Sequence, residues 1–566
     1  MRLTGAQIII ECLLEQGVDT IFGYPGGQIM PLYDALYDYT EDGRIRHILT
    51  AHEQGATHAA DGYARSTGKV GVAFATSGPG ATNTVTGIAT ANIDSSPIVV
   101  ITGQVPVSSI GKDAFQEVDI IGITYPITKH SYALRRMSDV ANAVREGFQI
   151  ARSGRPGAVL IDVPKDLFVG TFEYERQAPL PLLPAPALRE DKLKRLAGLI
   201  DESKRPVIHA GGGVCIAGAS EELTELAHKA DIPVATTLMC LGCFSRLDPL
   251  SLGIMGMHGE RKSNLAVQNA DLLITVGGRF SDRITGNPDS FAKKAMVVHI
   301  DIDRAEFNKN VPTELRVRAD IKEALAALIP LVKKQERTEW HAEIDSWRRA
   351  AQAKGEASEA SEDGESGTGA FTPANIIAAV YEEFGADTIV ATDVGQHQMW
   401  TAQHWPFSKP RKFITSGGMG TMGFGLGAAI GAQIANPKER VILITGDGSF
   451  RMNMNELVTA RLQGLPIIVF VMRNGTLGMV RQWQKLFWGK RYSATDLPDV
   501  IEYETLARAF GLDGWRVGNV AGLKQAIKEA RGTGKAAVIC CDVFIDENVW
   551  PIVPPGDTIE NQRMEE

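Results

Sequence analysis

Residues 440–476 read RVILITGDGSFRMNMNELVTARLQGLPIIVFVMRNGT. The runs 440–445 and 466–472 are short, apolar and rich in β-branched residues, and a helix-length segment separates them. This pattern predicts two parallel strands that are buried on both faces. A polar, glycine-containing loop follows each run, at 446–449 and at 473–476. The stretch therefore predicts an α/β unit with polar side chains at the carboxyl edge of its sheet.

Similar runs recur along nearly the whole chain. Residues 176–188 are rich in Pro and Leu, and residues 351–370 are small, polar and acidic, which indicates two linkers. We therefore expect an α/β fold of three doubly wound parallel-sheet domains at 1–175, 189–340 and 371–550, with a linker at 341–370 and a C-terminal tail at 551–566. The further predicted strands lie at 70–76, 97–102, 158–163, 206–210, 271–276, 296–302, 388–392 and 537–543.

The composition of the 566 residues excludes several classes of protein. The net charge is 58 − 67 = −9, which argues against nucleic acid or an anionic membrane as the main partner. No run reaches the roughly 18 apolar residues of a membrane helix, and the N-terminal segment has no secretory signature. Six cysteines are too few for a disulfide framework, and small apolar packing explains Cys240 and Cys243 better than metal or redox use. We expect a soluble, cytoplasmic protein.

The loops of the opening stretch carry candidate metal ligands. Asp447 and Asn474 follow neighbouring predicted strands, so both are expected at one edge of the sheet. Carboxylate, amide and carbonyl oxygens suit Mg²⁺, and a helix expected from about Asn453 adds its positive end for a diphosphate. An ordinary Asp-Gly turn is the alternative, but the pair favours a Mg²⁺–diphosphate site.

The other two units hold weaker candidates. Glu53 lies among Ala and Gly and is by default an exposed helical charge, although a buried functional acid would give the same pattern. The loops 23–27 and 76–80 are bare enough for a large ligand, but tight turns also explain them. The glycines at 211–213 follow a strand without matching the dinucleotide fingerprint. The charged residues near 279–303 fit either phosphate and ribose contacts or surface ion pairs.

Taken together, these segments resemble the thiamine diphosphate enzymes, and among them the acetohydroxyacid (acetolactate) synthase family. The resemblance runs from residue 3 to about residue 557. Its motifs are FGYPGG (22–27), HEQGA (52–56), TSGPGATN (76–83), GQVP (103–106), DAFQE (113–117), TKH (128–130), SGRPGAVLIDVPKD (153–166), GMHG (256–259), DVGQHQMW (393–400), SGGMGTMGFG (416–425), GDGSFRMN (446–453) and GMVRQWQ (478–484).

The resemblance implies a pyrimidine-binding first domain, an FAD-binding middle domain and a diphosphate-binding third domain. It implies a homodimer or homotetramer with active sites between chains, and it leaves room for a separate small regulatory subunit. The expected reaction decarboxylates pyruvate and joins the remainder to a second 2-oxo acid, pyruvate or 2-oxobutanoate, in the first common step of branched-chain amino acid biosynthesis. Related pyruvate oxidases or 2-oxo acid decarboxylases are the nearest alternative, and a non-catalytic flavin-binding regulator is a more distant one.

The resemblance also implies roles for single residues. Glu53 would hydrogen-bond N1′ of the aminopyrimidine, and Gln116, Phe115 and Lys165 would line the substrate approach. Met479 and Trp483 would lie at its mouth, where the tryptophan is linked to a preference for 2-oxobutanoate. The metal would be held by Asp447, Asn474 and the Thr476 carbonyl.

Two larger sets are expected on the cofactors. Those expected on thiamine diphosphate, besides Glu53 and Met479, are Tyr24, Pro25, Gly26, Pro79, Asn83, Gly395, Gln396, His397, Gln398, Gly420, Met422, Gly446, Gly448 and Ser449. Those expected on FAD are Arg155, Gly212, Thr237, Met257, His258, Gly277, Arg279, Arg283, Asp301 and Asp320. The chain departs from the family pattern at Cys240, Cys243, Ser281, Gly427 and Arg473.

Overall fold

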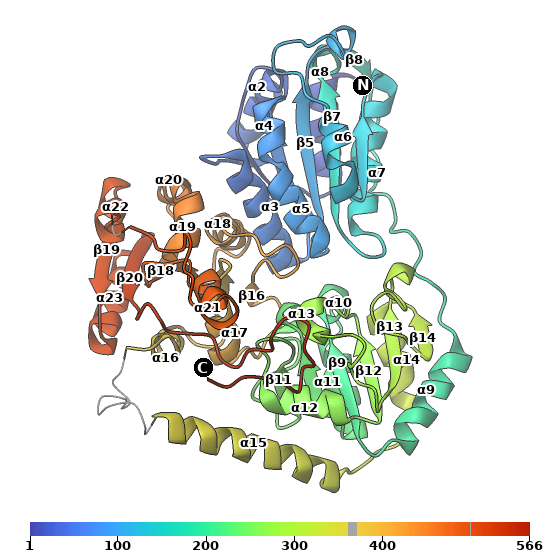
Figure 1. Cartoon of the computed structure of the whole chain (residues 1–566). Coiled ribbons are helices and arrows are strands. Elements are labelled where there is room, and N and C mark those ends of the chain that lie inside the picture. Colours follow the sequence, from blue (N-terminus) through green and yellow to red (C-terminus); the bar gives the residue numbers. More distant parts are fainter. Residues whose placement is uncertain (360–370, 499, 566) are drawn as a thin grey trace.

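The computed structural model of the chain describes residues 1–359, 371–498 and 500–565. Its framework is three six-stranded sheets whose strands are all parallel, each with apolar side chains buried on both faces. In Figure 1 the first unit stands above the other two, which lie side by side. This arrangement confirms the predicted α/β class. Within the described residues, no helix is both long and apolar enough to span a membrane.

The first unit contains the sheet β3-β2-β4-β5-β7-β6. The chain enters its first helix through a capping box, in which the Thr4 side chain accepts from the Gln7 amide. A separate antiparallel pair, β1 with β8, fastens the start of the chain to the end of the unit. The elements are β1 (Arg2–Thr4), α1 (Gly5–Glu15), β2 (Thr20–Gly23), α2 (Met30–Glu41), β3 (Arg46–Leu49), α3 (Glu53–Thr67), β4 (Gly71–Ala75), α4 (Pro79–Asn83), α5 (Val85–Ile93), β5 (Ile98–Gln104), α6 (Ile120–Thr124), β6 (His130–Ala133), α7 (Val140–Arg152), β7 (Ala158–Pro164), α8 (Lys165–Val169) and β8 (Thr171–Glu173).

The middle unit contains the sheet β11-β10-β9-β12-β13-β14. Counted along the chain, this is the strand order of dinucleotide-binding folds, and the order reverses between β9 and β12. The elements are α9 (Glu190–Glu202), β9 (Pro206–Ala210), α10 (Gly212–Ala217), α11 (Ser220–Ala230), β10 (Val234–Thr236), β11 (Ser251–Ile254), α12 (Arg261–Asn269), β12 (Leu272–Val276), α13 (Asp282–Thr285), β13 (Met296–Asp301), β14 (Leu315–Arg318), α14 (Ile321–Leu328) and α15 (Thr338–Glu359).

The third unit contains the sheet β16-β15-β17-β18-β20-β19, which has the same strand order as the first unit. Ligands of open α/β sheets bind where the order reverses, which is between β2 and β4 and between β15 and β17. The elements are α16 (Pro373–Phe384), β15 (Ile389–Thr392), α17 (Gln396–His404), β16 (Phe413–Ile414), α18 (Gly425–Ala435), β17 (Val441–Gly446), α19 (Asp447–Asn453), α20 (Leu457–Leu462), β18 (Ile468–Arg473), α21 (Gly478–Phe487), α22 (Tyr503–Ala509), β19 (Asp513–Val517), α23 (Val520–Thr533) and β20 (Ala537–Asp542).

The units are joined by close contacts. Helices α3 and α18 cross so tightly that a Cβ on Gly431 would lie 1.8 Å from the Ala59 carbonyl oxygen. The buried Asp94 accepts from Arg65 of the first unit at 3.1 Å and from the Gly418 amide of the third at 2.7 Å, and Arg279 of the middle unit lies 3.8 Å away. Asp94 therefore ties the three units together.

The first predicted linker and the beginning of the second can be compared with the structure. Residues 174–189 carry no helix or strand, as expected for the first linker. The second expectation is wrong up to Glu359, because α15 continues through it. Trp340 anchors this helix by donating to the Pro206 carbonyl at 3.1 Å, and its Ala-, Glu- and Lys-rich sequence favours helix. The remainder of that linker, 360–370, lies outside the described residues.

The tail after residue 550 packs against the middle unit. The Val553 amide donates to the Met257 carbonyl at 2.9 Å, and Gln562 Nε2 donates to the Gly259 carbonyl at 2.7 Å. Asn264 reaches the Ile559 carbonyl at 3.3 Å. The last residues therefore hold the loop 256–259, which contains Met257 and His258, two residues predicted to contact FAD.

Asp162 makes the stability of the first unit depend on pH. Its carboxylate accepts from Thr102 at 2.7 Å and from Gln104 at 3.0 Å, and burial raises the pKa of Asp162 to about 7. The folded chain thus holds a proton that the unfolded chain releases near pH 4, so this contribution to stability is lost as pH rises through 7. The loss is about 1.4 kcal/mol for each unit of the pKa difference.

We expect Asp162→Asn to gain thermal stability relative to the wild type as pH rises from 5 to 8, because the amide does not ionise. Differential scanning fluorimetry at both pH values measures the two midpoints. A difference between the two proteins that is the same at pH 5 and pH 8 would contradict the assignment.

Candidate functional site

The carboxyl edge of the third sheet gathers the predicted metal ligands. Asp447 Oδ2 accepts from the Gly475 amide at 2.9 Å, which places Asp447 beside the loop that holds Asn474 and Thr476. Asn474 Oδ1 accepts from the Thr476 amide at 3.2 Å. Burial raises the pKa of Asp447. The helix after the loop begins at Asp447 itself, so the expectation of a start near Asn453 is wrong, and the positive helix end lies closer to the carboxylate than predicted.

The donor set at this edge fits a hard cation. Within the described residues there is no cluster of three or more His, Cys, Asp or Glu side chains suited to a metal. A site built on one carboxylate, an amide oxygen and a loop carbonyl leaves positions for phosphate oxygens, which is how Mg²⁺ is commonly held.

The same edge leaves a bare cradle for an anion. His397 is buried, its Nε2 has no hydrogen-bond partner among the described residues, and burial lowers its pKa to about 3, so the ring is neutral. A Cβ on Gly446 would lie 2.8 Å from His397 Nδ1, and one on Gly478 would lie 1.9 Å from Gln396 Oε1. The absence of side chains here, with one unsatisfied ring nitrogen, fits a diphosphate.

Of the other residues expected on thiamine diphosphate, some lie at this cradle and one, Gln398, hydrogen-bonds elsewhere. Ser449 donates to the Val394 carbonyl at 2.9 Å, and the Met422 side chain reaches to 3.8 Å from the position of a Cβ on Gly448, so both stand at the cradle. Gln398 turns instead to Thr415 and Ser416. Gly395 and Gly420 have φ values of +152° and +66°, which suit glycine.

Glu53 is the first residue of α3 and is 9% exposed. Its Oε2 accepts from Asn83 Nδ2 at 2.9 Å, and a Cβ on Gly80 would lie 3.1 Å from Oε1. The default interpretation as an exposed charge is therefore wrong, because Asn83 and Gly80 of α4 pack against the carboxylate. Tyr24, Pro25 and Pro79 are exposed at the rim, and Gly26 lies against Thr76.

The predicted substrate-approach residues lie on two segments of the first unit. Gln116 has φ +62° and packs against Gly78, with 2.9 Å between its Cβ and a Cβ position there, so it borders the loop that carries Gly80. Phe115 is 84% exposed, and Lys165 opens α8. Within the described residues, no hydrogen bond or ion pair joins Glu53 to Lys165 or to the Asp447 loop.

The sequence analysis missed Glu456. This fully buried carboxylate of the third unit accepts from the amides of Ala51 and His52, both at 3.1 Å, immediately before Glu53. A Cβ on Gly55 would lie 2.0 Å from its Oε1. The only sign of this role in the sequence was an acidic residue within the largely apolar segment after Asn453. A charge on the exposed face of a helix would give the same pattern. Glu456 fixes the start of α3 from another unit.

We expect Glu456→Ala to lower the turnover rate at least tenfold at saturating cofactor, because two part-buried amides lose their acceptor and the start of α3 shifts. Steady-state rates and thiamine diphosphate affinity are measured together. Glu502→Ala, an exposed acid of the same unit, is the matched control. Equal rates in both variants would show that Glu456 does not position Glu53.

The middle unit brings its glycines together at the point where the strand order reverses. A Cβ on Gly211 would lie 2.2 Å from the Gly277 carbonyl oxygen, and one on Gly213 would lie 2.7 Å from the Gly277 Cα. Gly212 and Thr237 follow β9 and β10 at the same edge. This bare edge fits a dinucleotide pyrophosphate although the fingerprint is absent.

The charged residues expected on the flavin have other partners in the structure. Arg155 pairs with Glu306 at 2.6 Å, Arg279 reaches Asp94, and Asp320 caps α14 through the Glu323 amide at 3.1 Å. Asp301 accepts from the Asp303 amide at 2.8 Å. His258 contacts the Pro551 carbonyl at 3.1 Å, and burial lowers its pKa to about 4. The arginines therefore bridge the units, and their flavin contacts stay predictions.

Helix α21 carries Met479 and Trp483 to the boundary with the middle unit. The Arg283 guanidinium lies 5.4 Å from the Trp483 ring centroid, and Arg283 also reaches the Met257 sulfur at 3.8 Å. Trp483 Nε1 is buried without a hydrogen-bond partner among the described residues. Trp483 is thus held by stacking rather than by hydrogen bonds.

Comparisons with known proteins identify the family. Three thiamine pyrophosphate enzyme models match in order: the N-terminal TPP binding domain at 3–123, the central domain at 193–328 and the C-terminal TPP binding domain at 393–541. The chain is 46% identical to an acetolactate synthase large subunit of Parasynechococcus marenigrum, over 98% of the chain and 90% of that protein. It is 45% identical to the acetolactate synthase isozyme 1 large subunit of Escherichia coli (98% and 96%) and 44% identical to a probable acetolactate synthase large subunit of Methanocaldococcus jannaschii (99% and 95%). The chain therefore belongs to the acetolactate synthase large-subunit family of thiamine pyrophosphate enzymes.

Proposed function

We propose that this chain carries out its family's reaction at a centre formed by Glu53 of the first unit and the Asp447 edge of the third. The reaction decarboxylates pyruvate and joins the two-carbon remainder to pyruvate, giving 2-acetolactate, or to 2-oxobutanoate, giving 2-aceto-2-hydroxybutanoate. The observation that carries the proposal is the bare cradle around His397, with Asp447 and Asn474 at its edge. The three domains are proposed at 1–175, 189–340 and 371–550.

The residues present fit three cofactors. Asp447, Asn474 and the Thr476 carbonyl would hold Mg²⁺, and Gly395, Gln396, His397 and Ser449 would surround the diphosphate of thiamine diphosphate. When bound, this cofactor supplies the electron sink for decarboxylation. The strand order of the middle unit and its packed glycines support FAD there.

The side chains of this chain would orient the substrate, shield it from water and move a proton. Glu53, held by Asn83, would share a proton with the ring nitrogen of the aminopyrimidine. Met479 and Trp483 would present apolar surface at the mouth and exclude water, which favours condensation over protonation of the two-carbon remainder. Gln116 and Lys165 would orient the substrate carboxylate and carbonyl groups.

The assembly is proposed from two observations. Glu53 and the Asp447 loop lie on different units, and the family resemblance supports a homodimer or homotetramer in which the first unit of one chain faces the third unit of another. The relatives are named large subunits, which supports a separate small subunit. The six cysteines are all free thiols, which suits the cytoplasm.

The direct test is a product assay with pyruvate alone. Acidified product is converted to acetoin and measured by colour, with and without thiamine diphosphate, Mg²⁺ and FAD. We expect acetolactate that depends on thiamine diphosphate and Mg²⁺. Acetaldehyde as the main product would indicate a decarboxylase, and acetyl phosphate or acetate with peroxide would indicate an oxidase.

We expect Trp483→Leu to keep acetolactate synthesis from pyruvate and to lose a preference for 2-oxobutanoate of roughly tenfold. The indole face would pack on the extra methyl group, and one methyl in an apolar pocket is worth about 1–3 kcal/mol. A competition assay with both 2-oxo acids gives the product ratio. Phe487→Leu, which removes a ring 5.7 Å away on the same helix, is the control. An unchanged ratio would refute the specificity role.

A further inference from the structure

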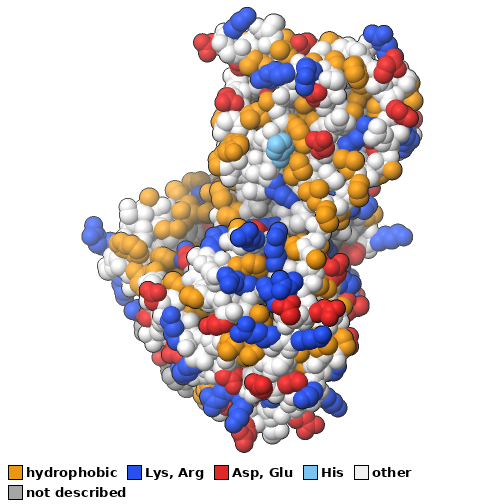
Figure 2. All heavy atoms as spheres, turned by 90° about the vertical axis from the view of Figure 1, so that its right-hand side faces the viewer, with side chains coloured by type: hydrophobic (Ala, Val, Ile, Leu, Met, Phe, Trp, Pro, Cys, Tyr) orange, Lys and Arg blue, Asp and Glu red, His pale blue; other side chains and the backbone are white. Residues whose placement is uncertain are grey.

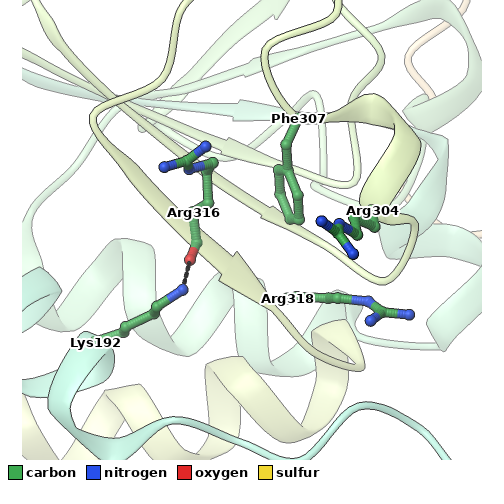
Figure 3. Close-up of a pocket in the computed structure, with 5 residues that line it drawn as sticks. All are labelled: Lys192, Arg304, Phe307, Arg316 and Arg318. Carbon is green, nitrogen blue, oxygen red and sulfur yellow. Dashed lines mark hydrogen bonds between the residues drawn. The ribbon is translucent and has the colours of Figure 1, made fainter.

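A hollow beside the edge strand of the middle sheet gathers four cationic side chains (Figure 3). Its volume is about 510 Å³, and it is lined by Lys192, Arg304, Phe307, Arg316 and Arg318. Arg316 and Arg318 lie two residues apart on β14, so both leave the same face of the strand. Lys192 comes from the first turn of α9, and Arg304 follows β13. The side of the molecule that carries these elements shows Lys and Arg gathered on its lower lobe (Figure 2).

The carboxylates nearest in sequence to this hollow are engaged elsewhere. Asp303 and Glu306 pair with Arg155 at 3.3 and 2.6 Å, and Asp191 pairs with Arg189 at 2.9 Å. Within the described part of the chain, no ion pair involves Arg304, Arg316 or Arg318. The hollow is therefore a concentration of uncompensated positive charge in a chain whose net charge is −9.

A second hollow provides a comparison, because acidic side chains of the same chain pair with basic side chains there. It has a volume of about 310 Å³ between α16 and α23 and contains Lys524, Lys528 and Arg531. Lys524 pairs with Glu382 at 2.7 Å, and Arg531 lies 3.6 Å from Glu383. Two of its three cations thus pair with acids of the chain, whereas no ion pair is found for the three arginines beside β14 among the described residues.

We propose that the hollow beside β14 binds a small anion with two phosphate groups and a flat ring, namely a nucleoside diphosphate. Guanidinium groups bind phosphate oxygens in bidentate fashion, and three of them line this hollow. The half-buried Phe307 ring, packed edge-on against His299 at 5.1 Å, offers an apolar face for the base (Figure 3). The volume lies within the usual range of about 300–1,000 Å³ for ligand sites.

This site is separate from the proposed flavin site. The glycines that mark the latter lie between β9 and β12, while β14 is the outer edge of the same sheet, beyond β13. Two flavin candidates lie close to β14: Asp301 is the register partner of Arg318 on β13, and Asp320 caps the helix that follows β14. The test therefore keeps the flavin and thiamine diphosphate sites filled.

The experiment is isothermal titration of ADP into the full chain saturated with thiamine diphosphate, Mg²⁺ and FAD. We expect micromolar binding that weakens with salt, weaker binding of inorganic pyrophosphate and none of adenosine. Arg316→Glu combined with Arg318→Glu should weaken ADP binding at least tenfold and leave acetolactate synthesis unchanged. Lys524→Glu combined with Lys528→Glu makes the same charge change at the second hollow and should bind ADP as the wild type does.

Three outcomes would overturn the proposal. The first is that the wild type binds neither ADP nor pyrophosphate at millimolar concentration. The second is that the Arg316 and Arg318 double variant retains ADP affinity, which would place the anion at a cofactor site. The third is an equal loss in both double variants, which would show a general charge effect. None of these outcomes alters the product assay, so the proposed function is tested separately.

Discussion

Glu53→Gln is expected to fold, to bind thiamine diphosphate and to form acetolactate at least 100-fold more slowly than the wild type. The amide keeps an oxygen that accepts from Asn83 Nδ2, so the start of α3 should be unchanged. It cannot share a proton with a ring nitrogen, and a positioned proton-transfer group contributes about 10²–10⁴-fold to a rate. Initial rates at saturating cofactor, with cofactor affinity measured on the same samples, check this result.

Asn83→Ala is the matched variant for Glu53. It removes the hydrogen-bond donor to Glu53 and leaves the carboxylate in place, so the rate should fall less than in Glu53→Gln. Near-normal acetolactate formation by Glu53→Gln would remove Glu53 from the mechanism. A loss of rate that tracks a loss of thiamine diphosphate binding would instead make Glu53 a binding group.

The strands that the sequence predicts all lie inside their sheets, with a neighbouring strand on each side. The run 466–472 is continuously apolar and the run 158–163 is apolar except for Asp162, and they coincide with β18 and β7. The strands that escaped prediction include edge strands. For example, β14 reads Leu-Arg-Val-Arg and β16 has two residues, so neither carries a continuous apolar signal. Edge strands have one neighbour and therefore tolerate alternating or short sequences.

The candidate site was predictable where it depends on strand adjacency. Asp447 and Asn474 follow β17 and β18, which pair directly, and the contact through Gly475 results from that pairing. The burial of Glu53 was not predictable from its neighbours in sequence. It depends on Asn83 and Gly80, which reach the carboxylate from α4, about 30 residues further along the chain. The role of Glu456 depends on a contact between the third unit and the start of α3.

Asp447→Ala is expected to weaken Mg²⁺ and thiamine diphosphate together and to leave FAD content unchanged. The ion would join the carboxylate to the diphosphate, so neither ligand should bind well alone. The expected loss of affinity exceeds 100-fold, since even partners that only orient a ligand are worth about 10–100-fold. Equilibrium dialysis measures retained thiamine diphosphate, and flavin absorbance measures FAD.

Asp447→Asn separates the charge of Asp447 from its structural role. Its amide oxygen can still accept from the Gly475 amide, so the loop with Asn474 should hold its shape while the metal loses an anionic ligand. If the carboxylate acts on the metal, this variant should resemble Asp447→Ala in affinity, and excess Mg²⁺ should partly restore it. If Asp447 only supports the loop, the Asn variant should behave as the wild type. A fall in flavin content parallel to the fall in thiamine diphosphate would mean that the substitution disturbs the whole chain, and the metal assignment would then be wrong.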